Sequence, residues 1–477
     1  MESNWTPAPD ARVSGFRPVS SRCPKRAIAW PGWASLWLLS GLALAVLEGA
    51  VRKWGLGGAH GLGSYAVYFS KDLMFAALVC LPASRGASRA TRQFGSWLGW
   101  GAGLVITGAA LSSLVTVNPV GALLTLRSAI VLPLLAWWAA SRVSRAALRR
   151  VLWSLVAFAI LNCSLGMVQN KLPPGHPLNR YAAESLEIVA EGSGVRATGT
   201  FAYITGLGVM GSVGIWTGLA LLSIGRKRWE QIAGLAGIAA GFGCGLASIS
   251  RGPVLTGAGM VVGWIFLGRP RGRVLLGLIT ALLLAAGTGV VIGAWPAVEG
   301  LWQGVEERQE HATDTLRERI FGHASEVISA LRQAPLGRGF GTEQMGGSFY
   351  ATGEMNFKEY EGQFPRMVME TGAAGLAGFV LVCAGALIAL DRARRAAGAV
   401  KGRGERRSGR RGKVAIGSEG DWGGVLAATE FLLLSLFCGN VLYNHTASAF
   451  AWMIFAAVLG ASTSQERESP SMFFPAL

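Results

Sequence analysis

Apolar runs of about twenty residues recur along most of this sequence, and they restrict its fold more than any other feature. A run of that length crosses the roughly 30 Å hydrocarbon core of a bilayer as an α-helix, which rises about 1.5 Å per residue. In lipid, only helices and closed barrels satisfy every backbone hydrogen-bonding group. We therefore predict an all-α, polytopic membrane protein with about 12 transmembrane helices, at residues 33–51, 65–81, 97–115, 120–140, 151–168, 204–224, 232–249, 254–267, 274–295, 368–390, 425–441 and 446–461.

The composition agrees with lipid as the solvent and argues against a soluble protein. Hydrophobic residues make up 51% of the chain, charged residues make up 15%, and the mean hydropathy is +0.40. A net charge of +17 can indicate nucleic-acid binding. Here most of the 44 lysine and arginine residues fall in alternate loops, as the positive-inside rule requires. We expect both termini to be cytoplasmic and no nucleic acid to be bound.

This topology divides the chain into a basic cytoplasmic tail (1–32), a transmembrane domain (33–461) and a cytoplasmic C-terminal tail (462–477). The domain has periplasmic loops at 170–200 and 298–365 and a basic cytoplasmic loop at 391–422, which we expect to be disordered over 402–420. The longest loop joins helices 9 and 10. Charged residues at helical spacing between 306 and 326 precede a glycine-rich stretch at 337–347, which predicts a helical cap and then a flexible loop.

Neither the cysteines nor the histidines indicate a metal site. Cys23 lies in the basic tail and the other five cysteines lie in apolar runs, while no two of the five histidines have the spacing of an HExxH motif. The glycine-rich run from Gly337 to Gly341 lacks the Lys-Ser/Thr ending of a P-loop. We expect no disulfide framework, no metal ion and no nucleotide cofactor.

Charged residues inside the predicted helices are costly in lipid and need partners. Lys71 and Asp72 lie within 65–81, and Arg127 lies within 120–140. We favour an interhelical structural pair among them over a substrate path, and the second interpretation stays open. Arg366 and Glu370 are four residues apart, which is the spacing of an ion pair along one helical face.

Three arginines fall on the predicted outer side beside helix ends: Arg196, Arg251 and Arg366. A guanidinium group stays charged and donates parallel hydrogen bonds, which suits phosphate oxygens. Each arginine taken alone is explained as well by capping a helix or reaching toward the membrane surface. Their common side favours a site for an anionic ligand.

Short segments on this outer side follow one another in a characteristic order. They are RATGTF at 196–201, SRGP at 250–253, PLGRGFG at 335–341, EGQF at 361–364 and ETGAAGL at 370–376. In this order they resemble the O-antigen ligase and polysaccharide polymerase superfamily, the WaaL/Wzy-like membrane glycosyltransferases. The resemblance is best over residues 196–379.

The resemblance implies an enzyme that acts outside the cytoplasmic membrane on undecaprenyl-diphosphate-linked sugars without a cofactor. Arg196 and Arg251 would stabilise the charge of the departing lipid diphosphate. In the ligase branch a histidine precedes the helix where this chain has Glu361, so Glu361 is our candidate for the base that takes a proton from the acceptor hydroxyl. Our candidates for substrate binding are Arg317, Arg319, Arg338, Arg366 and Glu370.

The expected function is that of a polysaccharide polymerase in the inner membrane of a bacterium, serving exopolysaccharide or O-antigen synthesis. The expected partners are a lipid-linked glycan donor, a glycan acceptor, membrane lipid, and a chain-length regulator or export proteins. The alternatives are an O-antigen ligase, a flippase for lipid-linked sugars, and a scaffold whose outer loop binds another protein. Transporters often have repeated halves, and the lack of a clear internal repeat favours an enzyme.

Overall fold

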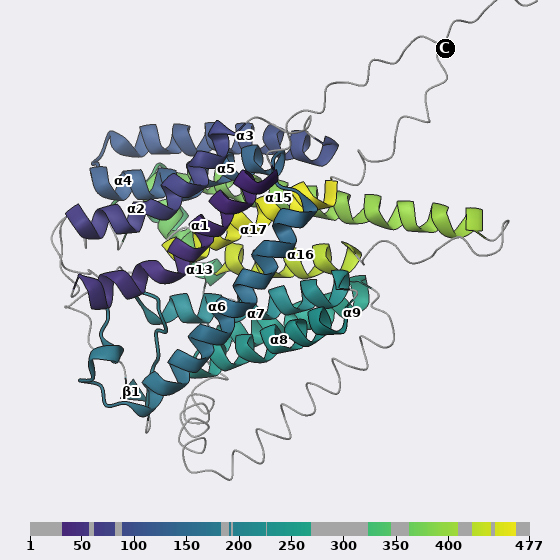
Figure 1. Ribbon diagram of the computed structural model, residues 1–477. Coiled ribbons are helices and arrows are strands. Elements are labelled where there is room, and N and C mark those ends of the chain that lie inside the picture. Colours follow the sequence, from purple (N-terminus) through teal and green to yellow (C-terminus); the bar gives the residue numbers. More distant parts are fainter. Residues whose placement is uncertain are drawn as a thin grey trace, which may run out of the picture.

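The computed structural model describes residues 31–56, 62–81, 88–182, 190–191, 194–225, 227–268, 323–344, 362–408, 422–439 and 444–463. These residues form a bundle of helices with one small hairpin, in which β1 (Ala190–Glu191) pairs with β2 (Gly194–Val195) (Figure 1). Within this part of the chain, seven helical spans are long and apolar enough to cross a membrane, and three shorter apolar helices accompany them. The protein is therefore a polytopic helical membrane protein.

The helices coincide with eleven of the twelve predicted segments, and the remaining segment, 274–295, lies outside the described residues. In chain order they are α1 (Pro31–Ala50) with the π-helical turn η1 (Val51–Gly55), α2 (Leu62–Ala77) with η2 (Leu78–Cys80), α3 (Arg89–Ser113), α4 (Pro119–Leu126), the π-helical turn η3 (Arg127–Val131), α5 (Leu132–Ala140), α6 (Arg145–Lys171), α7 (Ile204–Ile224), α8 (Arg228–Ala247), α9 (Arg251–Gly268), α15 (Gln363–Ser408), α16 (Trp422–Cys438) and α17 (His445–Thr463).

Two helices begin earlier than their apolar runs predict, because serine side chains cap their first turns. Ser88 accepts a hydrogen bond from the Thr91 amide at the start of α3, and Ser144 accepts one from the Ala147 amide at the start of α6. Both helices therefore include basic residues that precede the apolar run. The short predicted run 254–267 lies within the longer helix α9, which begins at Arg251 and ends at Gly268.

Glycines bring the most closely packed helices together. A Cβ atom at Gly108 of α3 would collide with the backbone of Thr371 and Gly375 on α15, and one at Gly218 of α7 would collide with the backbone of Gly234 on α8. In lipid, where apolar burial does not drive association between helices, such close backbone contact is a main source of packing energy. These pairs, α3 with α15 and α7 with α8, have the most extensive contacts among the described helices.

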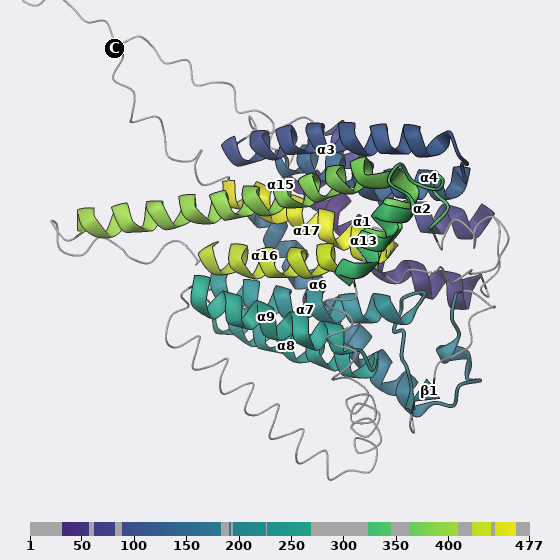
Figure 2. The same ribbon diagram turned by 180° about the vertical axis from the view of Figure 1, so that it is seen from behind.

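The helix α15 is much longer than predicted and projects beyond the bundle (Figures 1 and 2). The expectation of a loop at 391–422 that is disordered from 402 is wrong as far as Ser408, because these residues are helical. The cytoplasmic location of this segment stays a prediction. Alanine and arginine, which are strong helix formers, are frequent after Leu390, so the helix continues past the apolar run. Asp391 also pairs with Arg394 and Arg395 at the helical spacings of three and four residues.

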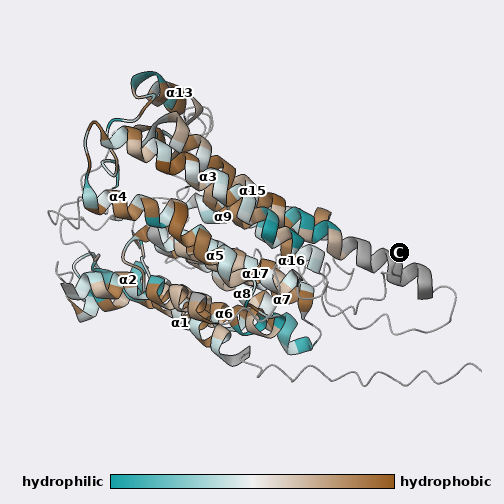
Figure 3. Cartoon of the chain, turned by 90° about the horizontal axis from the view of Figure 1, so that it is seen from above, coloured by the Kyte–Doolittle hydropathy of each residue, from teal (hydrophilic) through white to brown (hydrophobic). Residues whose placement is uncertain are grey.

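The α6–α7 connection and the helix α13 lie at the end of the bundle where α6 ends and α7 begins. The α6–α7 connection contains η4 (Pro177–Asn179) and the β1–β2 hairpin, in agreement with the predicted loop at 170–200. The amphipathic helix α13 (His323–Gln333) packs on the first turns of α15 through Ala330, Val368 and Met369. Figure 3 shows α13 at the edge of the bundle with hydrophilic residues on it. It is the only part of the predicted helical cap within the described residues.

Candidate functional site

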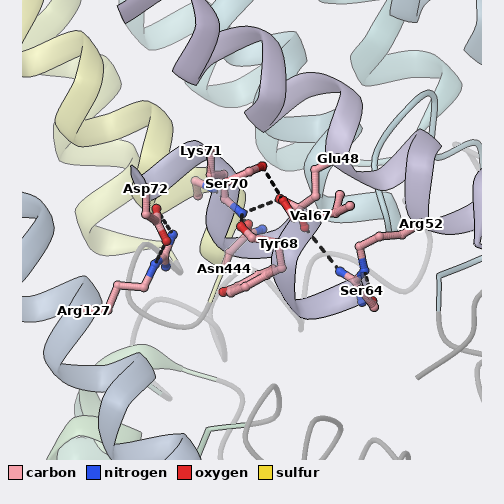
Figure 4. A network of polar contacts seen from close by, with 11 residues as sticks. Glu48, Arg52, Ser64, Val67, Tyr68, Ser70, Lys71, Asp72, Arg127 and Asn444 are labelled. Atoms are coloured by element: carbon pink, nitrogen blue, oxygen red, sulfur yellow. Dashed lines mark hydrogen bonds and ion pairs between the residues drawn. The ribbon is translucent and has the colours of Figure 1, made fainter. Parts of the chain in front are cut away.

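Six charged side chains lie near this end of the bundle, and we call them the charge cluster: Glu48, Arg52, Lys53, Lys71, Asp72 and Arg127 (Figure 4 shows all except Lys53). Five of them are buried, and Asp72 is half-buried. They come from α1, η1, α2 and η3, so four segments of the chain meet there. Charged groups within membrane helices are rare and usually functional, because their burial is costly unless they are paired. The charge cluster is therefore the first candidate for a functional site.

Asp72 and Arg127 form the interhelical pair that their position in the sequence predicts. The Arg127 Nε and Nη2 atoms donate to the two Asp72 carboxylate oxygens at 2.5 and 2.8 Å, which is the bidentate geometry that makes arginine pairs strong. The Tyr68 ring lies beside them, 5.5 Å from the Arg127 guanidinium and 3.9 Å from the Lys71 ammonium. Both cations thus face the negative side of an aromatic ring.

Lys71 pairs with Glu48 on α1, a partner outside the predicted set of Lys71, Asp72 and Arg127. The same carboxylate accepts a hydrogen bond from Arg52 at 3.3 Å, and Arg52 also donates to Ser64 at 3.0 Å. The sequence does contain a signal for this partner, because Glu48 is a charged residue inside the first apolar run. Arg52 and Lys53 directly follow the predicted segment 33–51, a position typical of the charges that flank a membrane helix, so the sequence does not indicate that they are buried.

Two π-helical turns carry three of the four cations. The turn η1 contains Arg52 and Lys53, and η3 begins at Arg127. A π-helical turn inserts an additional residue into a helix, which changes the direction of the following side chains, and such turns are frequent at functional sites. The hydropathy pattern of the sequence does not predict these turns.

Lys53 connects the charge cluster to the predicted RATGTF segment. Its Nζ atom donates to Thr198 Oγ1 and to the Gly199 carbonyl, both at 2.8 Å. From the other side, the Gln169 side-chain oxygen accepts from the amides of Thr198 and Gly199 at 3.1 and 2.7 Å. Gly199 has a φ of 59°, in the left-handed region that favours glycine.

Arg196 and Arg251, which are far apart in the predicted motifs, lie on segments that contact each other. Arg196 Nε donates to the Ser248 carbonyl at 3.2 Å, and the Ala197 amide donates to the Ala247 carbonyl at 3.0 Å. Ile249, between Ser248 and the start of α9 at Arg251, has a φ of 48°. This is a strained conformation for a β-branched residue, and strain of this kind concentrates at functional sites.

A second polar group surrounds Glu370, which is completely buried on α15. Thr125 Oγ1 of α4 donates to one carboxylate oxygen at 2.5 Å, and the Glu343 amide donates to the other at 3.0 Å. Gln344 in turn donates to Thr125 Oγ1 at 2.9 Å. Arg366 is also buried, one turn before Glu370, and its charge interacts favourably with the Glu370 carboxylate.

A flexible loop was expected at 337–347, of which residues 345–347 lie outside the described part of the chain. The glycine-rich segment at 335–341 is instead held by hydrogen bonds between α15 and the turn that joins α3 to α4. The Arg338 amide donates to the Met369 carbonyl at 2.6 Å, and the Ala373 amide donates to the Pro335 carbonyl at 2.9 Å, at the point where Gly372 interrupts α15. On the opposite side, the Phe340 amide donates to the Thr116 carbonyl at 3.0 Å. The prediction was wrong because glycines that suit a flexible loop also permit turns with positive φ and close backbone contact.

Four of the eight candidate residues form two pairs in the structure. Arg196 and the first residue of α9, Arg251, lie on adjoining segments, and Arg366 and Glu370 lie together on α15. The exposed Arg338 side chain donates to Gln333 at 2.8 Å. The predicted residues outside the described part of the chain are Arg317, Arg319 and Glu361.

No model of a known protein family matches the chain, and no curated protein is significantly similar to it. The site's geometry and chemistry therefore carry the functional argument. Among the described members of the charge cluster, Glu48 and Asp72 form ion pairs with Arg52, Lys71 and Arg127, and Lys53 contacts the adjoining Arg196 segment.

Proposed function

We propose that this chain is a polysaccharide polymerase-type glycosyltransferase. It joins undecaprenyl-diphosphate-linked oligosaccharide units at the periplasmic face of a bacterial inner membrane, in exopolysaccharide or O-antigen synthesis. The observation that carries the proposal is the pairwise contact of the motif segments. RATGTF contacts the turn before Arg251, and PLGRGFG bonds into the kink of α15 beside Glu370.

The proposed topology has twelve membrane helices with both termini in the cytoplasm. The helix α9 begins beside the Arg196 segment and ends at Gly268, toward the opposite end of the bundle. The next described helix, α13, packs on the first turns of α15. The apolar run 274–295 lies between these two helices in the sequence and is long enough to cross a membrane. We assign it as the ninth span, followed by the long periplasmic loop.

In the proposed reaction, an acceptor-sugar hydroxyl attacks the anomeric carbon of the donor glycan. A new carbon–oxygen bond forms as the bond to the lipid diphosphate breaks, with inversion at that carbon. Arg196 and Arg251 hold the departing diphosphate, whose charge grows as the bond breaks, and Glu361 accepts the hydroxyl proton. Arg317, Arg319, Arg338, Arg366 and Glu370 are the proposed substrate-binding residues.

The experiment is complementation of a strain from which the gene has been deleted. We would restore wild type, Arg251→Ala or Arg180→Ala, and measure lipid-linked glycans and surface polysaccharide by size. Arg180 is an exposed arginine of the α6–α7 connection and serves as the matched control. The proposal expects single repeat units to accumulate on outer-leaflet lipid with Arg251→Ala, and long polymer to return with Arg180→Ala.

The other outcomes contradict the polymerase proposal in distinguishable ways. Long chains retained on lipid would identify a ligase, because polymerisation would have occurred without transfer. Repeat units trapped on the inner leaflet would identify a flippase. Unchanged glycans in the deletion strain would exclude all three activities.

A further inference from the structure

We propose that Lys53 is a positioning residue that holds the Arg196–Thr200 segment and supplies the buried positive charge that attracts an anionic headgroup to it. The inference deepens the proposed function, from which it takes a prenyl-linked diphosphate as the anion. Binding of such an anion can be measured without glycosyl transfer, so the two proposals can fail separately.

One face of α1 holds this segment at three successive points. Thr200 Oγ1 donates to the Val46 carbonyl at 2.7 Å, and Lys53 Nζ bonds to Thr198 and Gly199. Between these points, Gly49 lies so close to the backbone at 200–202 that a Cβ atom would collide with it. Because Val46, Gly49 and Lys53 share one helical face, α1 and its π-helical turn determine where the segment lies.

Lys53 differs from the other cations of the charge cluster in its partners. Arg52 and Lys71 share Glu48, and Arg127 pairs with Asp72. Within the described residues, no ion pair joins Lys53 to a carboxylate, and its hydrogen-bond acceptors are neutral. The Trp54 ring, 4.7 Å from Nζ, offers a further weak attraction for a cation.

A buried ammonium group without an anionic partner is costly in a medium of low dielectric constant. An anion bound at Arg196 would lower that cost, because the attraction between buried charges is little screened by solvent. Lys53 is completely buried, so in this proposal it does not touch the ligand. It acts by holding the Arg196–Thr200 segment in place and through the electrostatic field of its own charge.

The test measures binding of farnesyl diphosphate and of uncharged farnesol to the full chain in nanodiscs, with empty nanodiscs as the blank. The variants are Lys53→Met and Lys53→Gln, the second of which keeps a hydrogen-bond donor for Thr198. Lys171→Met is the matched control, because Lys171 is an exposed lysine at the end of α6. Thermal unfolding of each variant establishes that it is folded.

We expect both Lys53 variants to weaken farnesyl diphosphate binding by about tenfold or more, since they remove a buried charge. Farnesol binding should stay unchanged, and Lys171→Met should alter diphosphate binding by about twofold at most, because exposed charges are screened. Wild-type affinity in a folded Lys53→Gln variant would overturn the inference. Equal loss of farnesol and farnesyl diphosphate binding would also overturn it, because a purely structural role affects both probes.

The same variants separate this inference from the proposed function. Loss of diphosphate binding in Lys53→Gln, together with unchanged glycans in the deletion strain, would support the anion site and reject the polymerase. Normal diphosphate binding in Lys53→Gln, together with accumulation of repeat units in Arg251→Ala, would reject the role of Lys53 and support the polymerase.

Discussion

Asp72 and Arg127 are each costly to bury in a membrane protein, and together they determine how two segments of the bundle pack. Each alone would expose a charge to lipid or to an apolar interior, at a cost of several kcal/mol. Paired in bidentate geometry, they join α2 to η3 across 55 residues of sequence. The pair therefore selects one arrangement of these helices over others.

Replacing one member of this pair should destabilise the protein strongly. We expect Asp72→Asn to lower the free energy of unfolding by on the order of 3 kcal/mol, because Arg127 would remain buried without its counter-charge. The measurement is reversible unfolding in detergent or, failing reversibility, the thermal midpoint.

Asp391→Asn is the matched control for that substitution. Asp391 also pairs with arginines, but its side chain is 25% exposed and one partner is largely in solvent. Its loss should cost less than about 1 kcal/mol. Equal effects of Asp72→Asn and Asp391→Asn would contradict the view that burial makes the Asp72–Arg127 pair important.

Among the elements, α15 combines a kink, a docking site for the glycine-rich segment and two of the candidate residues. Gly372 has a φ of 66° and a ψ of −168°, a conformation available almost only to glycine. The kink frees backbone groups that the 335–341 segment then satisfies. The position of Glu370 thus depends on a turn two residues further along the helix.

Substituting Gly372 should disturb this arrangement more than a helical glycine substitution normally does. We expect Gly372→Ala to cost about 2 kcal/mol or more, because a Cβ atom would be strained and would collide with the backbone of Pro335 and Leu336. Unfolding in detergent measures the loss. Gly103→Ala on α3 is the control, since a Cβ atom there meets no other atom within 4 Å.

The control should be neutral or stabilising by up to about 1 kcal/mol, because alanine is the better helix former. A tolerated Gly372→Ala variant with wild-type stability would mean that α15 can straighten without losing its contacts with the glycine-rich segment.

For the whole molecule, the important feature is that the motif segments and the charge cluster lie toward the same end of the bundle. The α6–α7 connection, the turn before α9 and the glycine-rich segment all belong to this end (Figures 1 and 2). In the proposed topology it is the periplasmic end. The opposite end carries the start of α8 and the long extension of α15.

Cysteine labelling would test this orientation. In a cysteine-free background, Gly175→Cys should react with a membrane-impermeant maleimide in intact cells, because position 175 is exposed in the α6–α7 connection. Lys227→Cys, at the exposed start of α8, should react only after permeabilisation. The reverse pattern would place the candidate site in the cytoplasm, away from lipid-linked glycans exported to the periplasm.

The sequence by itself predicted the membrane fold, the position of nearly every described helix and the need for partners of Asp72 and Arg127. These properties depend on local hydropathy and on the cost of a charge in lipid, both of which can be judged from a short stretch of sequence. The helix starts at Arg89 and Arg145 were missed, because the capping serines lie outside the apolar runs. The continuation of α15 to Ser408 was missed because residues 391–408 lack apolar periodicity, and their basic, glycine-containing composition is also typical of disordered segments.

Only the tertiary structure decided which charges meet and which loop is fixed. Glu48 with Lys71, Lys53 with Thr198, and Thr125 with Glu370 are separated by 23, 145 and 245 residues. Such partners are selected by how whole helices pack, and the glycines that permit that packing carry no side chain to signal it. The local sequence establishes that a buried charge needs a partner, whereas the assembled bundle determines which residue it is.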